Sequence, residues 1–149
     1  MEAKELKVIF GKLAKSYGFE QAFGRWYKES RECIAILELQ KSNYGNYFQL
    51  LIKVFIKGLF GHDYEPNKEL MMSSIGHINS GEPKKYKTVL DLDRVFSEQD
   101  RIASLAELFE NHIVPFTNKA LSRAGIWELA EKEDVFITPA MRNELNFDQ

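Results

Sequence analysis

Alternating apolar and polar positions in the middle of the chain predict two neighbouring β-strands. In residues 46–57 every second position is apolar, namely Phe48, Leu50, Ile52, Val54 and Ile56. In residues 33–41 one side of the alternation consists of Cys33, Ala35, Leu37 and Leu39. Successive side chains of a strand point to opposite faces of a sheet, so each segment has one face that belongs in a core. The polar residues 42–46 between them include Asn43 and Gly45, which suit a hairpin loop. The pattern predicts an antiparallel hairpin.

Weaker patterns on both sides of this hairpin predict further strands. Residues 19–28 are rich in aromatic side chains and alternate, which favours one outer strand. Residues 70–78 favour a fourth strand that ends at His77 or Ile78, and residues 88–93 favour an extended segment. Glycine, proline and asparagine predict loops over residues 57–68 and 79–87.

Helical spacing predicts helices at both ends of the chain. Residues 2–17 carry apolar side chains three and four positions apart, and Gly18 can end that helix. Ser97 can cap the longest helix, whose apolar stripe consists of Ile102, Leu105, Phe109, Ile113, Phe116 and Ala120. Pro115 lies inside that stripe and predicts a kink. Ser122 and Thr138 can cap two more short helices. Strands followed by helices predict a single α+β domain over residues 1–149, with a mainly antiparallel sheet of about four strands packed against the N-terminal and C-terminal helices.

The charge balance and the cysteine count indicate which partners and which cellular compartment to expect for this protein. The 149 residues include 20 Lys and Arg against 22 Asp and Glu, which argues against a nucleic-acid partner. A single cysteine, Cys33, fits a reducing compartment, so we expect a cytoplasmic protein. Charges alternate through residues 1–7, where a signal peptide would need an apolar core, so no export is expected. No window approaches the roughly 20 apolar residues of a membrane span, so no membrane association is expected.

Several short phrases, taken in order, resemble one family. They are Gly18-Phe19, Trp26-Tyr27, Leu39-Gln40-Lys41-Ser42, Tyr44-Gly45, Gly58-Leu59, Pro66, His77-Ile78, Leu90-Asp91, Asp100-Arg101 and Val114-Pro115-Phe116. In this order and spacing they are similar to the family called domain of unknown function 4304. The chain departs from the family pattern at Asn79 and Ser80, where that pattern contains arginine. The resemblance implies a shared fold and brings no activity or catalytic residues with it.

The second face of the predicted sheet is the main candidate for a binding site. Polar and aromatic side chains that can share this face are Arg25, Tyr27, Glu38, Gln40, Tyr47, Gln49 and Lys53. Antiparallel sheets often have one solvated face, so the alternative reading is a surface of cross-strand pairs. If helices cover only the other side, this face suits a protein partner or a small polar ligand. We therefore expect a non-catalytic interaction module that neutralises or scaffolds a partner.

A small hydrolase is the alternative reading of the same chain. Its candidate catalytic residues are His62, His77, Asp91 and Asp93, which the two long loops could bring together. The histidines lack the spacing of a local metal motif, so neither a metal nor a cofactor is expected. Cys33 shares a strand face with apolar residues and is expected to be buried.

A third reading is a nucleic-acid binder, which requires one basic surface. It would have to join Lys84, Lys85 and Lys87 to Lys119 and Arg123. In a chain with more acidic than basic residues, three lysines in a loop are more often a solvated surface.

Overall fold

The computed structural model describes residues 1–146, and it confirms an α+β fold built on one antiparallel sheet. The strands are β1 (Glu20–Ala22), β2 (Arg25–Glu29), β3 (Cys33–Lys41), β4 (Phe48–Ile56) and β5 (Ile78–Gly81). They pair in sequence order, each antiparallel to the next, and the long β3–β4 hairpin forms the centre. The predicted hairpin is confirmed, and the amide of Ser42 donates to the carbonyl of Tyr47 across its loop. The last three residues of the predicted domain lie outside the described residues.

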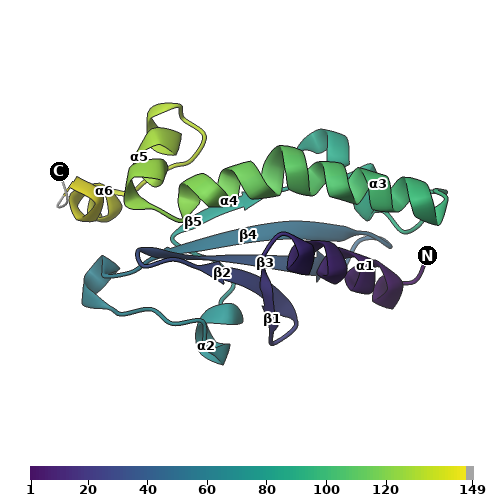
Figure 1. Cartoon of the computed structure of the whole chain (residues 1–149), viewed down its shortest axis with the longest axis horizontal. Coiled ribbons are helices and arrows are strands. Elements are labelled where there is room, and N and C mark those ends of the chain that lie inside the picture. The colour runs from purple at the N-terminus through teal and green to yellow at the C-terminus, as the bar shows by residue number, and fades with distance from the viewer. Residues whose placement is uncertain (147–149) are drawn as a thin grey trace.

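The helices lie on both sides of this sheet but cover it unequally. They are α1 (Ala3–Ser16), α2 (Lys68–Met71), α3 (Glu98–Leu108), α4 (Val114–Ala120), α5 (Arg123–Glu131) and α6 (Pro139–Asn146). Figure 1 shows α3 and α4 running above the sheet and the short α2 below it, with α1 beside β1 and β2. We call the side of α1, α3 and α4 the helix-covered face and the side of α2 the second face.

The main core lies between the sheet and the helices on the helix-covered face. Aromatic rings link the layers, because Phe10 of α1 contacts both Trp26 of β2 and Phe109, each at 4.9 Å between ring centroids. The alternating apolar side chains of β3 and β4 point into this core, as predicted. A second, smaller cluster lies on the second face and consists of Ile34, Ile36, Phe55, Leu70 and Met71. Burial of apolar area on both faces at roughly 25 cal/mol per Å² is the main force that stabilises the fold.

The three side chains predicted to cap the first turns of helices form the expected hydrogen bonds. The hydroxyl of Ser97 accepts from the amide of Asp100, and the hydroxyl of Ser122 accepts from the amide of Gly125. Thr138 accepts from the amide of Met141 in the same way at the start of α6. Each bond satisfies an amide that the first helical turn leaves without an intrahelical partner.

Two strand predictions were wrong in detail, which gives five strands rather than about four. Residues 19–28 form two strands, because Phe23 and Gly24 both take left-handed backbone angles and turn the chain back on itself. Residues 70–78 are not a strand. The side chain of Asn67 accepts from the amide of Leu70 and starts α2, while the strand itself begins at Ile78 and includes part of the predicted 79–87 loop.

Two helical details also differ from the predictions. Residues 88–93, expected to be extended, include a short 3-10 turn at Thr88–Leu90. The break expected at Pro115 is a π-helical turn, Phe109–Ile113, that ends just before the proline in the first turn of α4. Proline has no amide to donate to the carbonyl four residues earlier, so the register of the helix changes there. Ile102 of the predicted stripe is 38% exposed, and its neighbour Arg101 is buried instead.

Candidate functional site

Three of the seven predicted binding residues form a buried ion cluster on the second face. Nζ of Lys53 lies 2.8 Å from Oε1 of Glu38, and Nη2 of Arg25 lies 3.1 Å from Oε2 of the same carboxylate. Lys53 also donates to the main-chain carbonyls of Met71 and Ser73, at 3.0 and 2.7 Å. Its side chain is 1% exposed. These charges hold residues 57–77 against the sheet, so this part of the second face is roofed rather than open.

The other four predicted residues do not join this cluster. Tyr27 pairs with Glu20 of β1, and its hydrogen bond to that carboxylate, together with burial, raises the pKa of the phenol. Gln40 and Gln49 are direct cross-strand partners near the loop end of the β3–β4 hairpin, and both are exposed. Tyr47 is half-buried there and forms an isolated bridge with Asp91. A hollow of about 330 Å³ beside this hairpin end is lined by Tyr47, Gln49 and Asp91, with Lys87 and Arg94 at its margin.

The four residues of the hydrolase hypothesis do not share one location. Asp91 pairs with Tyr47 before the start of β4, whereas the imidazole of His77 contacts Ile56 at the end of β4. Nine residues of extended strand separate these points, roughly 30 Å at 3.3 Å per residue. Asp93 stays with Asp91, whose carboxylate accepts from its amide, and His62 is exposed beside the ring of Tyr64. The structure therefore places His62 and His77 away from Asp91 and Asp93.

His77 is built into the second-face packing. Its Nδ1 accepts from the amide of Ile56 at 2.9 Å, and its ring meets those of Phe55 and Tyr64 edge-on. Burial lowers the pKa of this imidazole to about 4. A neutral ring that accepts at Nδ1 carries its proton on Nε2, which suits packing.

Cys33 and the acidic residues offer no metal site in the part of the chain that the structure describes. Cys33 is fully buried, and burial raises the pKa of its thiol to about 12. Within residues 1–146, no three His, Cys, Asp or Glu side chains gather closely enough to hold a metal ion. Over the same residues, no helix is long and apolar enough to cross a membrane.

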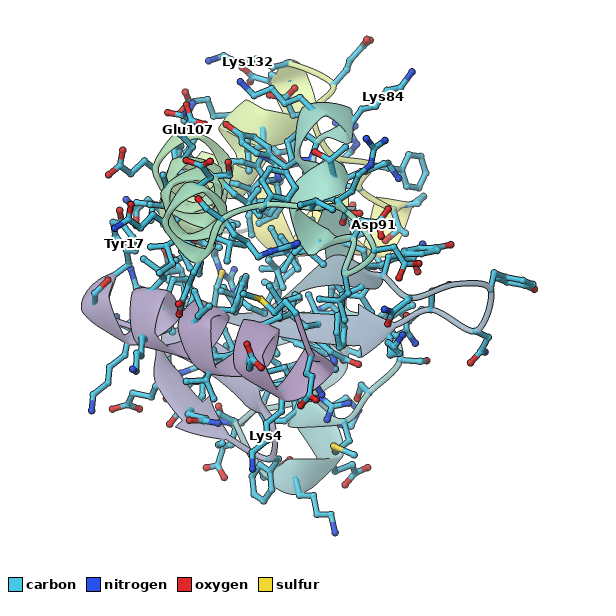
Figure 2. The ribbon with its side chains drawn as sticks, turned by 90° about the vertical axis from the view of Figure 1, so that its right-hand side faces the viewer. Lys4, Tyr17, Lys84, Asp91, Glu107 and Lys132 are labelled. Carbon is cyan, nitrogen blue, oxygen red and sulfur yellow. The ribbon has the colours of Figure 1, made fainter. Side chains whose placement is uncertain are left out.

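The basic residues of the nucleic-acid hypothesis have different partners. Lys119 pairs with Glu128 at 2.8 Å, and Arg123 donates to the main-chain carbonyls of Lys57 and Glu144. Lys87 is 4.0 Å from Glu82, while Lys84 extends from the far end of the molecule in Figure 2.

Another hollow lies between α1 and the β1–β2 hairpin, and we call it the α1–β1 groove. It has a volume of about 600 Å³ and runs along the outer side of α1, where β1 extends the sheet beyond the helix. Its floor includes Val8, Gly11 and Trp26, and its far wall includes Gln21 and Gly24. A second hollow of similar volume shares Gly11, Gln21 and Trp26 with it and is also lined by Gly18 and Tyr27.

Trp26 is the most unusual residue of this groove. It is 3% exposed, and its indole Nε1 has no hydrogen-bond partner among the described residues. Buried N–H groups are almost always paired, so an unpaired one in a residue that lines a hollow is a group that a bound acceptor could satisfy. A Cβ on Gly11 would lie 3.0 Å from this nitrogen, so glycine is what lets α1 pass so close to the indole.

Four lysines of α1, namely Lys4, Lys7, Lys12 and Lys15, line the α1–β1 groove. Figure 2 shows Lys4 on the side of α1 away from α3, where the groove lies. No carboxylate belongs to the described lining of this groove, and Glu20 of the adjoining hollow is bonded to Tyr27.

The sequence interpretation missed this groove because its lysines have the pattern of an ordinary solvated helix face. The one available signal was Gly11, a glycine in the middle of an otherwise regular helix, where it costs about 1 kcal/mol relative to alanine. Such a glycine often has a packing or functional reason.

Fold and site together define a small α+β domain with a five-stranded antiparallel meander and one basic groove. The chain belongs to the family described as domain of unknown function (DUF4304), whose model matches residues 10–119. The matched region contains the whole sheet, α3 and most of α4, together with most of the groove, and stops before α5 and α6. Neither a curated protein nor a solved structure matches the chain.

Proposed function

We propose that this protein is a non-catalytic binding module that holds a partner in the α1–β1 groove. The observation that carries the proposal is the buried indole N–H of Trp26, which lacks an acceptor beside a hollow of about 600 Å³. That volume lies in the range typical of ligand sites. The single thiol of the chain is in keeping with a cytoplasmic setting for the module.

The chemistry of the lining favours binding over catalysis. Among its described residues the groove has ammonium groups, one amide, an indole and aliphatic carbon, without a histidine, carboxylate, thiol or hydroxyl. Nucleophilic or acid–base catalysis needs a positioned pair of such groups. Charged and apolar surface placed together is what a binding site needs to hold and orient a partner.

Site-specific photo-crosslinking on the full chain tests this proposal. Benzoylphenylalanine at position 8 places a reactive group in the groove, because Val8 is 49% exposed there. The same group at position 136 is the control, since Phe136 is 81% exposed after α5. In a cytosolic extract of the native host, we expect a discrete crosslinked species from position 8 and none from position 136. Identical products from both positions, or none from either, would refute the groove as the site.

The predicted face at the hairpin end is tested in the same assay. The triple variant Gln40→Ala, Tyr47→Ala, Gln49→Ala removes the exposed side chains of that surface. Undiminished crosslinking from position 8 in this variant is expected if the partner lies in the groove. Loss of the product without unfolding would move the site to the hairpin end.

A further inference from the structure

The α1–β1 groove concentrates positive charge in a protein whose overall charge is negative. The formal net charge is −2, yet four lysines are among the residues that line this hollow. Within residues 1–146, Lys4, Lys12 and Lys15 form no ion pair with a carboxylate. The ammonium of Lys7 also has no carboxylate partner there and lies 5.5 Å from the centroid of the Phe48 ring, a cation–π contact. Charges of one sign around a concave surface raise the local concentration of a partner of opposite sign.

The spacing of the lysines selects an extended partner rather than a small anion. From Lys4 to Lys15 the helix rises roughly 16 Å at 1.5 Å per residue. A single phosphate or carboxylate can reach only one or two of these ammonium groups. An extended peptide of about five residues covers the same length at 3.3 Å per residue.

Apolar side chains alternate with this charge. Val8 lies between the lysines, and Phe23, 48% exposed, occupies the turn next to Gly24 of the groove wall. Phe23 has a backbone φ of 54°, a conformation that is unfavourable for a bulky residue and that holds its ring at the hairpin tip. An occupant must therefore match apolar contacts as well as ammonium groups.

Resting on the function proposed above, we infer that the occupant is an acidic segment of another protein with apolar residues between its carboxylates. Carboxylates can pair with the lysines, apolar side chains can contact Val8 and Phe23, and a main-chain carbonyl can accept from Trp26 after a small shift of α1. Single-stranded nucleic acid fits less well, since its binding sites rely on several aromatic platforms and arginines. The described lining contains no arginine, its one aromatic ring is buried, and the nearby Phe23 would be a single exposed platform.

Selection from a random 12-residue peptide library on the intact 149-residue chain tests this inference. The reporter is the fluorescence of Trp26 in a Trp127→Phe background, which leaves one indole in the protein. We expect selected peptides to be net acidic with apolar residues, and to bind more weakly as NaCl rises from about 50 to about 300 mM.

Charge reversal in the groove provides the matched comparison. Lys4→Glu with Lys12→Glu should weaken peptide binding by about ten-fold, given up to about five-fold for each exposed pair. The variant Lys4→Arg with Lys12→Arg keeps both charges and should keep peptide binding. The variant Lys84→Glu with Lys85→Glu reverses the same number of charges outside the groove and should not change peptide binding. Circular dichroism of each variant verifies folding.

The outcomes separate this inference from the proposed function. Groove-dependent peptides that are neutral or basic, or an acidic peptide indifferent to the Lys4 and Lys12 reversal, would overturn the acidic partner. So would an oligonucleotide of equal charge that binds as tightly as the selected peptides. If position 8 gives a discrete crosslink but the library yields no acidic peptide, the groove remains the proposed binding site and only the acidic occupant is refuted. If neither the crosslink nor an acidic peptide is found, the proposed function and this inference are both refuted.

Discussion

Lys53 and Glu38 form a 2.8 Å ion pair on the sheet face opposite α1, under the main chain of Met71 and Ser73. The two residues come from adjacent strands, β4 and β3, and lie two pairing positions apart on the same face, since Glu38 is opposite Leu51 and Lys53 is opposite Ile36. Because Lys53 bonds the carboxylate on one side and two carbonyls on the other, a single ammonium group links the main chain of Met71 and Ser73 to the sheet. A buried ion that is fully hydrogen-bonded in this way fixes one arrangement of the covering segment.

Replacing Lys53 with methionine should therefore destabilise the fold strongly. Lys53→Met preserves the aliphatic stem but leaves two buried carbonyls and one arm of Glu38 without a donor. We expect a loss of about 3 kcal/mol in the free energy of unfolding, the low end for breaking a buried pair, because Arg25 still binds Glu38. Urea denaturation measures it. The control is Lys57→Met, whose pair with Glu29 is partly exposed and should cost less than about 1 kcal/mol. Equal losses would show that burial of Lys53 is not what matters.

Local sequence patterns were sufficient for much of the fold. The hairpin, α1 and the capped starts of α3, α5 and α6 follow from side chains within a few residues of one another. Period-two alternation also identified the core face of β3 and β4. Such signals are short-range, so they survive without knowledge of the tertiary arrangement.

The cover of the second face comes from a distant segment, which local patterns could not predict. The second face of β4 carries a lysine between two apolar residues, a pattern typical of a half-solvated face; these residues are Leu51, Lys53 and Phe55. Only when α2 places Leu70 and Met71 on that face does Lys53 become buried. The groove is likewise a product of where α1 sits relative to β1, a relationship that no local spacing of lysines encodes.

His77 should make the fold less stable below neutral pH. Its pKa falls from 6.5 to about 4 because burial penalises the charged ring. Above pH 6.5 the imidazole is neutral in both states. As the pH falls from 6.5 toward 4, the unfolded chain takes up a proton that the folded chain does not, and stability is lost.

The expected loss across that window is about 2 kcal/mol, less than the full shift implies because the side chain is only partly buried. His77→Asn keeps an acceptor near Nδ1 for the Ile56 amide but does not titrate, so its unfolding free energy should change less over this pH range. Some slope will remain, since burial also lowers the pKa of His112. Urea titrations at several pH values compare the two proteins, and parallel curves would rule out His77 as a source.

Gly125 should not tolerate even a methyl group. It lies in the first turn of α5, and a Cβ there would overlap the carbonyl oxygen of Lys119 and lie 2.7 Å from its carbonyl carbon. Gly125→Ala gains about 1 kcal/mol of helix propensity but forces α4 and α5 apart, so we expect a net loss of about 2 kcal/mol. Ala124→Gly, at the exposed neighbouring position, should cost only about 1 kcal/mol from propensity. Thermal unfolding measures the stability of both variants. If Ala124→Gly proved more destabilising than Gly125→Ala, the close approach of α4 and α5 at Gly125 would be contradicted.

Arg101 should prove to be the residue that shapes residues 89–94. It is 1% exposed and donates to the carbonyls of Val89, Asp91 and Arg94, at 2.6, 3.2 and 2.9 Å. Lysine cannot reproduce this fork of donors, so Arg101→Lys should lose about 2 kcal/mol although it keeps the charge. Because the bonds are to one segment, amide hydrogen exchange should accelerate most in residues 89–94 and least in β3. The control is Arg94→Lys, which replaces a largely exposed side chain 4.0 Å from Asp91 and should change neither stability nor exchange measurably. Uniform acceleration across the sheet would instead mean that Arg101 supports the whole core rather than this segment.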